Sequence, residues 1–404
     1  MFKRLTDTIR RRPIVGWILF FAIMAGVFLL GLLAASITER RAEIATIYNN
    51  KKTDIPEFET RNEIWGLNFP REYETWAQTA DTSFTSEFNG SHAVDVLAAR
   101  PQMVIFWAGY SFSREYNSPR GHKHAIEDMR AILRTGNPGI DGEGDIQPAT
   151  CWTCKGPDVP RMMHEMGIAN FYKAPWSQLG AEIMNPIGCG DCHDPKTMDL
   201  KITRPALIEA FQRQGKDITK ATQQEMRSLV CAQCHVEYYF KGEGKYLTFP
   251  HDKGFTVEDI EAYYDEMNYS DYTHKLSRAP ILKAQHPDYE LWRMGIHGQR
   301  GVSCADCHMP YVSEGGVKYS DHQIVSPLAR IDKTCQTCHR EDEETLRQNV
   351  YERQRMANDV RNRVEKELAK AHIEAKYAWD NGATEPEMKA ALQAIRKSQW
   401  RWDF

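Results

Sequence analysis

The feature that most constrains this 404-residue chain is the arrangement of its cysteines. All ten fall into five C-x-x-C pairs, of which four are followed directly by histidine and one by lysine. A disulfide framework requires neither one repeated spacing nor an adjoining base. Zinc ribbons also pair C-x-x-C units, but they have no use for a histidine after each one. C-x-x-C-H is instead the attachment signature of c-type haem, in which two thiols bond to the vinyl groups and the histidine binds iron.

The chain is therefore predicted to fold around five covalent haem c groups. The attachment residues are Cys151, Cys154, Cys189, Cys192, Cys231, Cys234, Cys304, Cys307, Cys335 and Cys338. The residues that follow the pairs are Lys155, His193, His235, His308 and His339, which we expect to be axial iron ligands.

The N-terminus predicts export from the cytoplasm. Residues 13–38 carry no charge, and five basic side chains precede them: Lys3, Arg4, Arg10, Arg11 and Arg12. The positive-inside rule places residues 1–12 in the cytoplasm and the rest of the chain outside. Residues 13–38 are either a transmembrane anchor or a cleaved signal peptide, and the length of the apolar run favours the anchor. The predicted location is periplasmic, which fits haem attachment outside the cytoplasm.

Composition limits the remaining classes. With 42% hydrophobic and 26% charged residues the chain is expected to fold, and its net charge of −4 argues against a nucleic-acid partner. We expect a mainly α multihaem cytochrome with little β structure, in which short helices and loops surround the haems over residues 39–340. Apolar residues at helical spacing also predict a helix over residues 121–135. Residues 341–404 predict long C-terminal helices, incomplete at residue 404 and interrupted at Asp380-Asn381-Gly382.

Lys155 marks one haem as different from the others. A neutral amine is a strong donor to iron, and coordination together with burial can remove the proton of a group whose pKa is ordinarily about 10.4. Four histidine-ligated haems can carry electrons, whereas the lysine-ligated haem is the candidate for binding a substrate at an open position.

From about residue 100 onwards the chain resembles the pentahaem cytochrome c nitrite reductases, which form ammonia. The resemblance is carried by one C-x-x-C-K and four C-x-x-C-H sites in this order. It is also carried by the segments 231–240 (CAQCHVEYYF), 282–287 (LKAQHP), 295–298 (GIHG) and 320–323 (SDHQ). It implies six-electron reduction of nitrite to ammonium, with Arg134, Tyr238 and His286 as catalytic residues.

The same resemblance implies further ligands. A calcium ion would be bound by the side chains of Glu237 and Gln285 and by the carbonyls of Tyr238 and Lys283. The distal iron ligands would be His322 for the second haem, His122 for the third, with His124 as its rival, and His297 for the fifth. The distal ligand of the fourth haem would lie beyond Phe404, so the sequence is expected to be truncated, or another residue takes over this role. His372 does not match that position.

The resemblance also implies a homodimer formed through the C-terminal helices. The expected electron donor is a membrane tetrahaem quinol dehydrogenase or a soluble multihaem protein. Two other functions remain open: a pentahaem reductase of sulfite or hydroxylamine, and a pure electron carrier in which Lys155 is only an alternative ligand.

Overall fold

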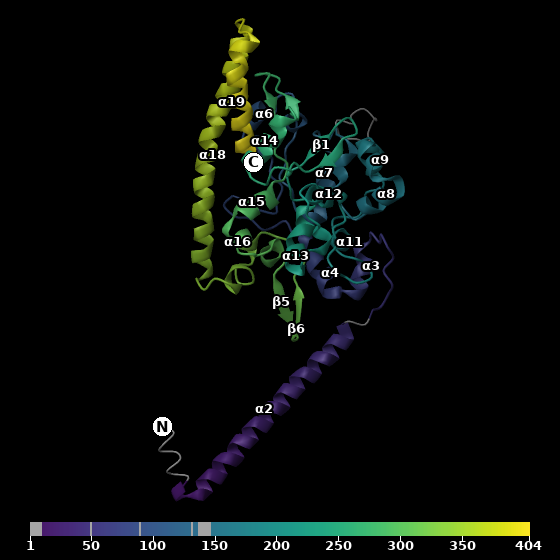
Figure 1. Ribbon diagram of the computed structural model, residues 1–404, viewed down its shortest axis with the longest axis vertical. Coiled ribbons are helices and arrows are strands. Elements are labelled where there is room, and N and C mark those ends of the chain that lie inside the picture. Colours follow the sequence, from purple (N-terminus) through teal and green to yellow (C-terminus); the bar gives the residue numbers. More distant parts are fainter. Residues whose placement is uncertain (1–9, 49–50, 89, 131, 136–146) are drawn as a thin grey trace. The chain divides into compact units, whose positions relative to one another are not determined.

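The structure is a computed structural model that describes residues 10–48, 51–88, 90–130, 132–135 and 147–404 (Figure 1). The chain divides into two compact units. One comprises residues 1–52 and 312–319, and the other comprises residues 53–311 and 320–404. All the predicted haem and active-site residues belong to the second unit.

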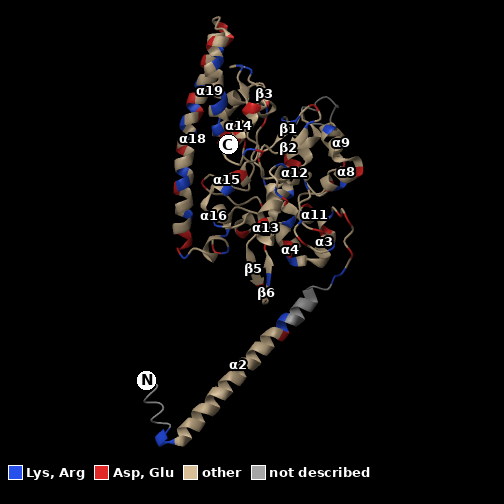
Figure 2. Ribbon diagram, viewed as in Figure 1, with Lys and Arg blue, Asp and Glu red and all other residues tan. Residues whose placement is uncertain are grey.

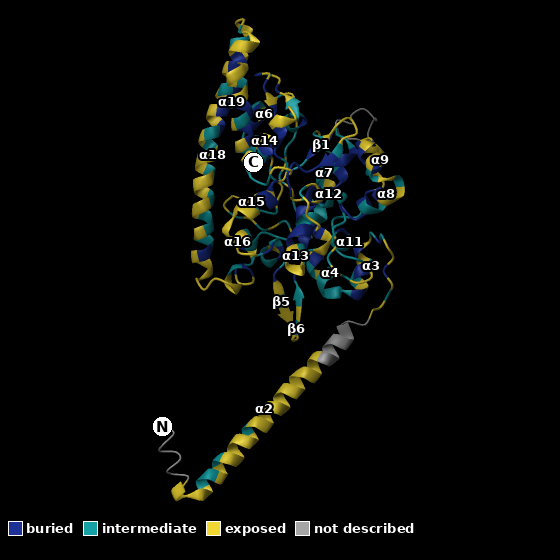
Figure 3. Ribbon diagram, viewed as in Figure 1, coloured by how far each residue is buried: buried dark blue, intermediate teal, exposed yellow. Residues whose placement is uncertain are grey.

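Helix α2 (Pro13–Tyr48) accounts for most of the described part of the first unit. An 18-residue window within its segment Pro13–Arg41 has a mean hydropathy of 2.7, and none of that window is buried. At 1.5 Å per residue these 29 residues extend about 43 Å, enough to cross a hydrocarbon core of about 30 Å. The helix is largely uncharged (Figure 2) and exposed (Figure 3), and its exposed residues include many large apolar ones. It is the one helix among the described residues that is long and apolar enough to span a membrane, a property that signal sequences share.

The second unit is built mainly from short helices. Before the C-terminal region they are α3 (Asn62–Asn68), α4 (Pro70–Ala77), α5 (Val96–Ala99), α6 (Gln102–Phe106), α7 (Glu127–Arg130), α8 (Asp158–Met166), α9 (Ile168–Lys173), α10 (Trp176–Gly180), α11 (Cys189–Cys192), α12 (Pro205–Arg213), α13 (Gln223–Ala232), α14 (Val257–Glu266), α15 (Asp288–Met294), α16 (Ile296–Gln299) and α17 (Cys304–His308). The 3₁₀ turns are η1 (Gln78–Ala80), η2 (Ser111–Ser113), η3 (His122–His124), η4 (Ala149–Trp152), η5 (Ile218–Lys220), η6 (Pro327–Ala329) and η7 (Cys335–Thr337).

Strands are few, as expected. In the described part of the chain they form three two-stranded sheets: β1 (Tyr239–Lys241) with β2 (Tyr246–Thr248), β3 (Tyr272–Thr273) with β4 (Pro280–Ile281), and β5 (Tyr311–Glu314) with β6 (Val317–Ser320). The first two pairs are antiparallel, with Phe240 opposite Leu247 and Thr273 opposite Pro280. The prediction of a mainly α fold is confirmed.

Local sequence explains where several helices begin. The Thr222 hydroxyl accepts a hydrogen bond from the Glu225 amide, and the Glu225 carboxylate accepts one from the Thr222 amide. The pair Ser303 and Asp306 caps α17 in the same reciprocal way, within the fourth cysteine motif itself. Such capping boxes satisfy amides that would otherwise lack a partner at the first turn of a helix.

Two long helices form the C-terminal region. Helix α18 (Glu343–Asp380) is followed by α19 (Glu385–Asp403), which packs against it, and α18 also packs against α6 (Figure 1). The break predicted at Asp380-Asn381-Gly382 is confirmed, and Gly382 adopts a positive φ of 88° in the turn. Buried residues from these helices share one hydrophobic cluster with Phe106 and Trp107.

The continuous helix expected over residues 121–135 is replaced, in its described residues, by η3 and the four-residue α7. Polar side chains bind the chain here in ways that compete with a regular helix. The Asp128 carboxylate accepts from both the amide and the side chain of Arg120, and the Thr135 hydroxyl donates to the Met129 carbonyl.

Candidate active site and haem attachment sites

The C-x-x-C-K segment is fixed to the core through Trp152. This residue is fully buried, its ring stacks on Trp176 with centroids 4.3 Å apart, and its indole N–H donates to the Trp176 carbonyl at 3.0 Å. The Thr150 hydroxyl donates to the carbonyl of Lys245 at 2.7 Å. The largest apolar cluster of the second unit therefore supports the loop that presents Lys155.

Arg204 holds the backbone on both sides of Lys155. Its side chain is 1% exposed; Nε donates to the Thr153 carbonyl at 2.8 Å and Nη2 to the Gly156 carbonyl at 3.0 Å. Nη2 also pairs with the buried carboxylate of Asp191 at 2.6 Å. Because Asp191 lies between Cys189 and Cys192, this arginine joins the first cysteine motif to the second.

Arg134, Tyr238, His286 and Lys155 come from four separate segments and act electrostatically on one region. Burial raises the pKa of the Cys151 thiol to about 12, while the charges of Arg134 and Lys155 oppose the rise. Burial raises the pKa of Tyr238 well above its usual value, and the neighbouring Cys151 and Cys154 thiols add to this. Arg134 and Tyr238 therefore lie near Cys151, and His286 lies near Lys155.

The side chain of His286 is accessible at its surface, but many protein atoms surround it. Removal from bulk water lowers the pKa of His286 to about 3, and the charges of His235 and Lys155 lower it further. The guanidinium of Arg134 lies over the rings of Phe112 and Tyr116, at 4.7 and 5.8 Å from their centroids. An arginine held in this way presents a defined charge to an anion.

Four pairs of histidine rings have centroids about 6 Å apart. The distances are 6.1 Å for His122 and His235, 6.2 Å for His193 and His322, 6.2 Å for His297 and His339, and 6.0 Å for His235 and His286. Two imidazoles that bind one metal ion from opposite sides at about 2 Å place their centroids about 6 Å apart. The pairs expected for the third, second and fifth haems therefore each fit a metal ion with two histidine ligands, although the spacing alone would suit His286 as well as His122 opposite His235.

In two of these histidines, the hydrogen bond at Nδ1 leaves Nε2 free to bind a metal. Nδ1 of His193 bonds to the Met198 carbonyl at 2.8 Å, and Nδ1 of His322 bonds to the Ser320 carbonyl at 2.7 Å. Because a carbonyl can only accept, Nδ1 carries the proton and Nε2 keeps its lone pair for a metal. His124, the rival of His122, has both nitrogens engaged, with Glu127 and with the Ala80 carbonyl.

His308 of the fourth motif has no such partner among the histidines that the structure describes. Its Nδ1 bonds to the Val325 carbonyl at 3.1 Å. His372 lies elsewhere: it is fully buried, bonds to Ser277 and Gln399, and stacks on His274 with centroids 3.8 Å apart.

Several cysteine motifs lie close together in space. The Cys154 thiol lies near that of Cys234, and Cys231 lies near Cys304. The third motif is therefore a neighbour of both the first and the fourth.

The residues expected to bind calcium also lie together. The buried carboxylate of Glu237 accepts from the Gln285 amide at 2.6 Å and from the Tyr264 hydroxyl at 3.0 Å, and the Gln285 side chain bonds to the Lys283 carbonyl. Burial raises the pKa of Glu237 well above its usual value, which a nearby cation would reverse. The described residues contain no group of three or more His, Cys, Asp and Glu side chains suited to a metal, so a set completed by carbonyl oxygens is the arrangement that fits.

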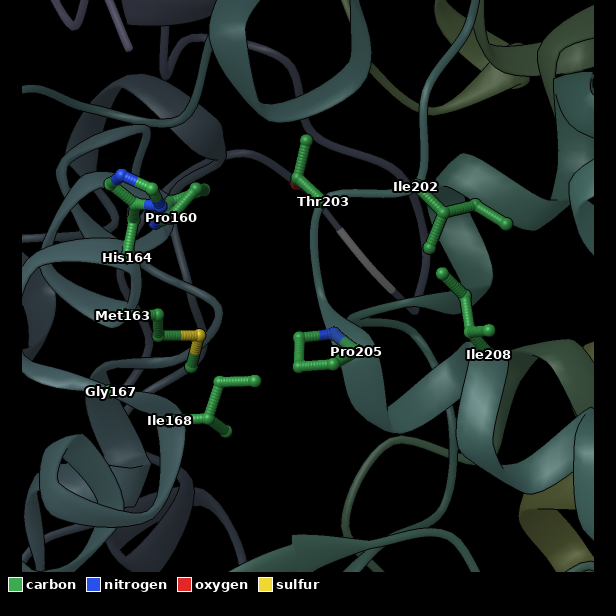
Figure 4. A pocket seen from close by; sticks show the side chains of 9 residues that line it. All are labelled: Pro160, Met163, His164, Gly167, Ile168, Ile202, Thr203, Pro205 and Ile208. Carbon is green, nitrogen blue, oxygen red and sulfur yellow. The ribbon is translucent and has the colours of Figure 1, made fainter.

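A pocket of about 410 Å³ lies apart from these groups, and Figure 4 shows it between apolar side chains of α8 and α9 and those at the start of α12. None of the predicted catalytic residues lines it. His164 at its edge stacks on Phe58 with centroids 4.8 Å apart, so this histidine is a packing residue.

Several residues around the site have no counterpart in the sequence predictions. Arg204 is one, and Asp288, whose carboxylate bonds to His235, is another. Asp403 accepts from the Ala284 amide at 2.7 Å and pairs with Lys283 at 3.0 Å. Each lies far along the chain from at least one partner, and no local motif distinguishes it from a surface charge.

Comparison with known proteins agrees with this geometry. The family model described as cytochrome c552 matches residues 61–404. The chain belongs to the cytochrome c552 family. Covalent haem c is accordingly the prosthetic group of its cysteine motifs.

Similar curated proteins are named cytochrome c-552. The chain is 73% identical to that of Porphyromonas gingivalis over 389 residues, which cover 96% of this chain and 78% of the relative. It is 70% identical to that of Bacteroides thetaiotaomicron, covering 96% and 79%, and 47% identical to that of Aliarcobacter butzleri, covering 96% and 77%.

Among solved structures, a cytochrome c nitrite reductase from Desulfovibrio desulfuricans is similar to this chain with a TM-score of 0.82 and 34% sequence identity. The match covers 87% of this chain and 80% of the other, whose catalytic subunit has two calcium sites.

Proposed function

We propose that this chain reduces nitrite to ammonium at the haem attached through Cys151 and Cys154, with Lys155 as an iron ligand. One nitrite takes up six electrons and eight protons and yields ammonium and two waters. The observation that carries the proposal is the convergence of Arg134, Tyr238, His286 and Lys155 on this attachment site. The similarity to a solved cytochrome c nitrite reductase supports it.

When bound, the first haem supplies an iron that can take a small ligand and pass electrons to it. Lys155 must offer a neutral amine, and Arg204 orients the loop so that this amine has a fixed position. The remaining haems would be held by His193 with His322, His235 with His122, His339 with His297, and His308.

Arg134 and His286 supply the two functions that an oxygen-bearing anion needs. The guanidinium attracts nitrite and holds it by charge-assisted hydrogen bonds. The neutral imidazole of His286 can relay protons to the oxygens as the N–O bonds break, donating its N–H while its other nitrogen accepts a proton from water. The hydroxyl of Tyr238 is a further hydrogen-bond donor on the same side of the site.

The Glu237 and Gln285 side chains, with the carbonyls of Tyr238 and Lys283, would hold a calcium ion. An all-oxygen set with one carboxylate suits this cation. Its charge would keep Glu237 ionised and attract the anionic substrate. The two calcium sites of the similar nitrite reductase support this assignment.

The location and the partners form part of the proposal. Helix α2 would anchor the protein in the cytoplasmic membrane with the haem unit in the periplasm, close to a membrane tetrahaem quinol dehydrogenase; a soluble multihaem protein is the alternative donor. Helix α18 exposes Met356, Val360, Ile373 and Tyr377, which supply apolar surface for a homodimer (Figure 3).

The decisive experiment uses the purified holoprotein with reduced viologen and nitrite, and quantifies ammonium. We expect one ammonium for each nitrite consumed, and we expect Lys155→Leu to abolish turnover while leaving the low-spin haems intact. Lys220→Leu is the matched control, because the Lys220 side chain is 83% exposed. Nitrite consumption without ammonium would refute the proposal.

The same assay separates the two alternatives. Sulfite or hydroxylamine reduced faster than nitrite would favour a different reductase. A pure electron carrier would reduce none of the three and would show no high-spin haem signal.

A further inference from the structure

The third motif differs from the others in what binds the second nitrogen of its histidine. Nδ1 of His235 lies 3.0 Å from a carboxylate oxygen of Asp288. The corresponding nitrogens of His193, His308 and His322 face backbone carbonyls. His235 is thus the one histidine of this group, among the residues that the structure describes, whose Nδ1 faces a full negative charge within hydrogen-bond distance.

Asp288 is held in place from several directions. It is the first residue of α15, and the Tyr289 amide that follows it donates to the carbonyl of His235 at 3.1 Å. Two residues after Asp288, the buried carboxylate of Glu290 accepts from the Glu237 amide at 3.0 Å and pairs with His251 at 2.6 Å. The start of the helix is therefore attached to the chain at His235 and just after it, which restricts where the Asp288 carboxylate can lie.

A carboxylate that accepts a hydrogen bond from an axial histidine affects both the donor strength of the ring and the reduction potential of the metal. It draws the Nδ1 proton away and makes Nε2 a stronger donor to the metal. Stronger donation stabilises ferric over ferrous iron, and hydrogen bonding to the ligands is among the terms that set the potential of a haem.

We propose that Asp288 is a positioning residue that lowers the reduction potential of the third haem relative to the second and the fourth. This rests on His235 being an axial ligand, which is part of the proposed function, but not on nitrite being the substrate. The place is significant because the third motif lies close to both the first and the fourth. A lower potential at this position holds electrons less tightly next to the Lys155 site.

The effect should be moderate because Asp288 acts on the metal only through the His235 ring. Loss of an outer carboxylate typically weakens metal binding by about tenfold to a hundredfold. We take the lower end, applied to ferric relative to ferrous iron. Tenfold in the ratio of oxidised to reduced haem corresponds to about 59 mV for one electron.

The test is a spectroscopic redox titration of the intact holoprotein, followed by visible absorption and electron paramagnetic resonance. In Asp288→Asn, which preserves shape, we expect one low-spin midpoint to rise by about 59 mV and the others to stay. Asp288→Glu restores the charge and should return that midpoint most of the way towards the original value. Glu341→Gln is the matched control, since Glu341 lies 4.0 Å from His339 Nδ1, beyond hydrogen-bond distance.

Two results would overturn the proposal. In the first, no midpoint moves further in Asp288→Asn than in Glu341→Gln. In the second, all midpoints move together, which indicates a general change of structure. Because potentials are measured without substrate, a failure here is distinguishable from a failure to form ammonium.

Discussion

Replacement of Arg204 by glutamine should destabilise the protein and disturb the Lys155 loop together. The Arg204 side chain is 1% exposed and its partner Asp191 is 5% exposed. Removing one member of a buried ion pair costs about 3–5 kcal/mol, because the remaining charge stays buried without a partner. A glutamine can restore at most one hydrogen bond, worth about 1 kcal/mol. The expected net loss is therefore about 3 kcal/mol in the free energy of unfolding.

For a unit of this size, with an entropy of unfolding of about 2.1 cal/mol/K per residue, such a loss corresponds to a fall in Tm of about 4 °C. It is measurable by calorimetry of the oxidised holoprotein at a fixed scan rate. The carbonyls of Thr153 and Gly156 also lose their donor in this variant. The spectrum of the first haem should therefore change even where the protein is fully folded.

The matched control is Arg355→Gln. Arg355 makes a two-pronged ion pair with Glu87, but both side chains are substantially exposed, so the same substitution should leave Tm nearly unchanged. If Arg204→Gln unfolded at the same temperature as this control, the reasoning about the buried pair would be wrong. If it unfolded earlier but the first-haem spectrum were unchanged, Arg204 would support the fold without positioning Lys155.

Three further outcomes follow from individual contacts. Burial lowers the pKa of His372 to about 3, whereas in the unfolded chain its pKa is about 6.5. As the pH falls below about 6.5, the unfolded chain therefore binds a proton that the folded protein does not. The free energy of unfolding, relative to that of His372→Gln, should fall by about 2 kcal/mol between pH 7 and pH 5 in denaturant titrations. Asp403→Asn should raise the calcium dissociation constant about tenfold in chelator titrations, because Asp403 holds Lys283, whose carbonyl is a proposed ligand. Gly156→Ala should alter the first-haem spectrum, since Gly156 has φ of 152° and an added Cβ would lie 2.0 Å from the Asn185 carbonyl oxygen.

The parts of the fold that could be predicted from sequence depend on local signals. The C-terminal helices follow from composition, and their break follows from an Asp-Asn-Gly turn that the structure places between α18 and α19. The five motifs predicted haem attachment because the chemistry needs two thiols and a base at one fixed spacing. In each case the information lies within a few residues.

The helix expected over residues 121–135 shows where such reasoning ends. The apolar spacing was present, but Asp128 binds Arg120 and Thr135 binds back to Met129, and these bonds divide the segment. Apolar periodicity indicates which side chains can face a core. It does not indicate which polar side chains will form local hydrogen bonds that compete with those of a helix.

The residues that position the proposed metal ligands could not be predicted from the sequence, because their partners lie far away along the chain. Lys283 and Asp403 are 120 positions apart, and His235 and Asp288 are 53 apart. By contrast, the carbonyls that fix His193 and His322 lie only 5 and 2 positions away. When a nearby carbonyl fixes the Nδ1 proton, local sequence alone prepares the histidine to bind a metal through Nε2. A carboxylate from a distant segment adds a negative charge that the histidine's own loop cannot provide. The third motif lies close to the first, so such a charge there can influence the supply of electrons to the Lys155 site.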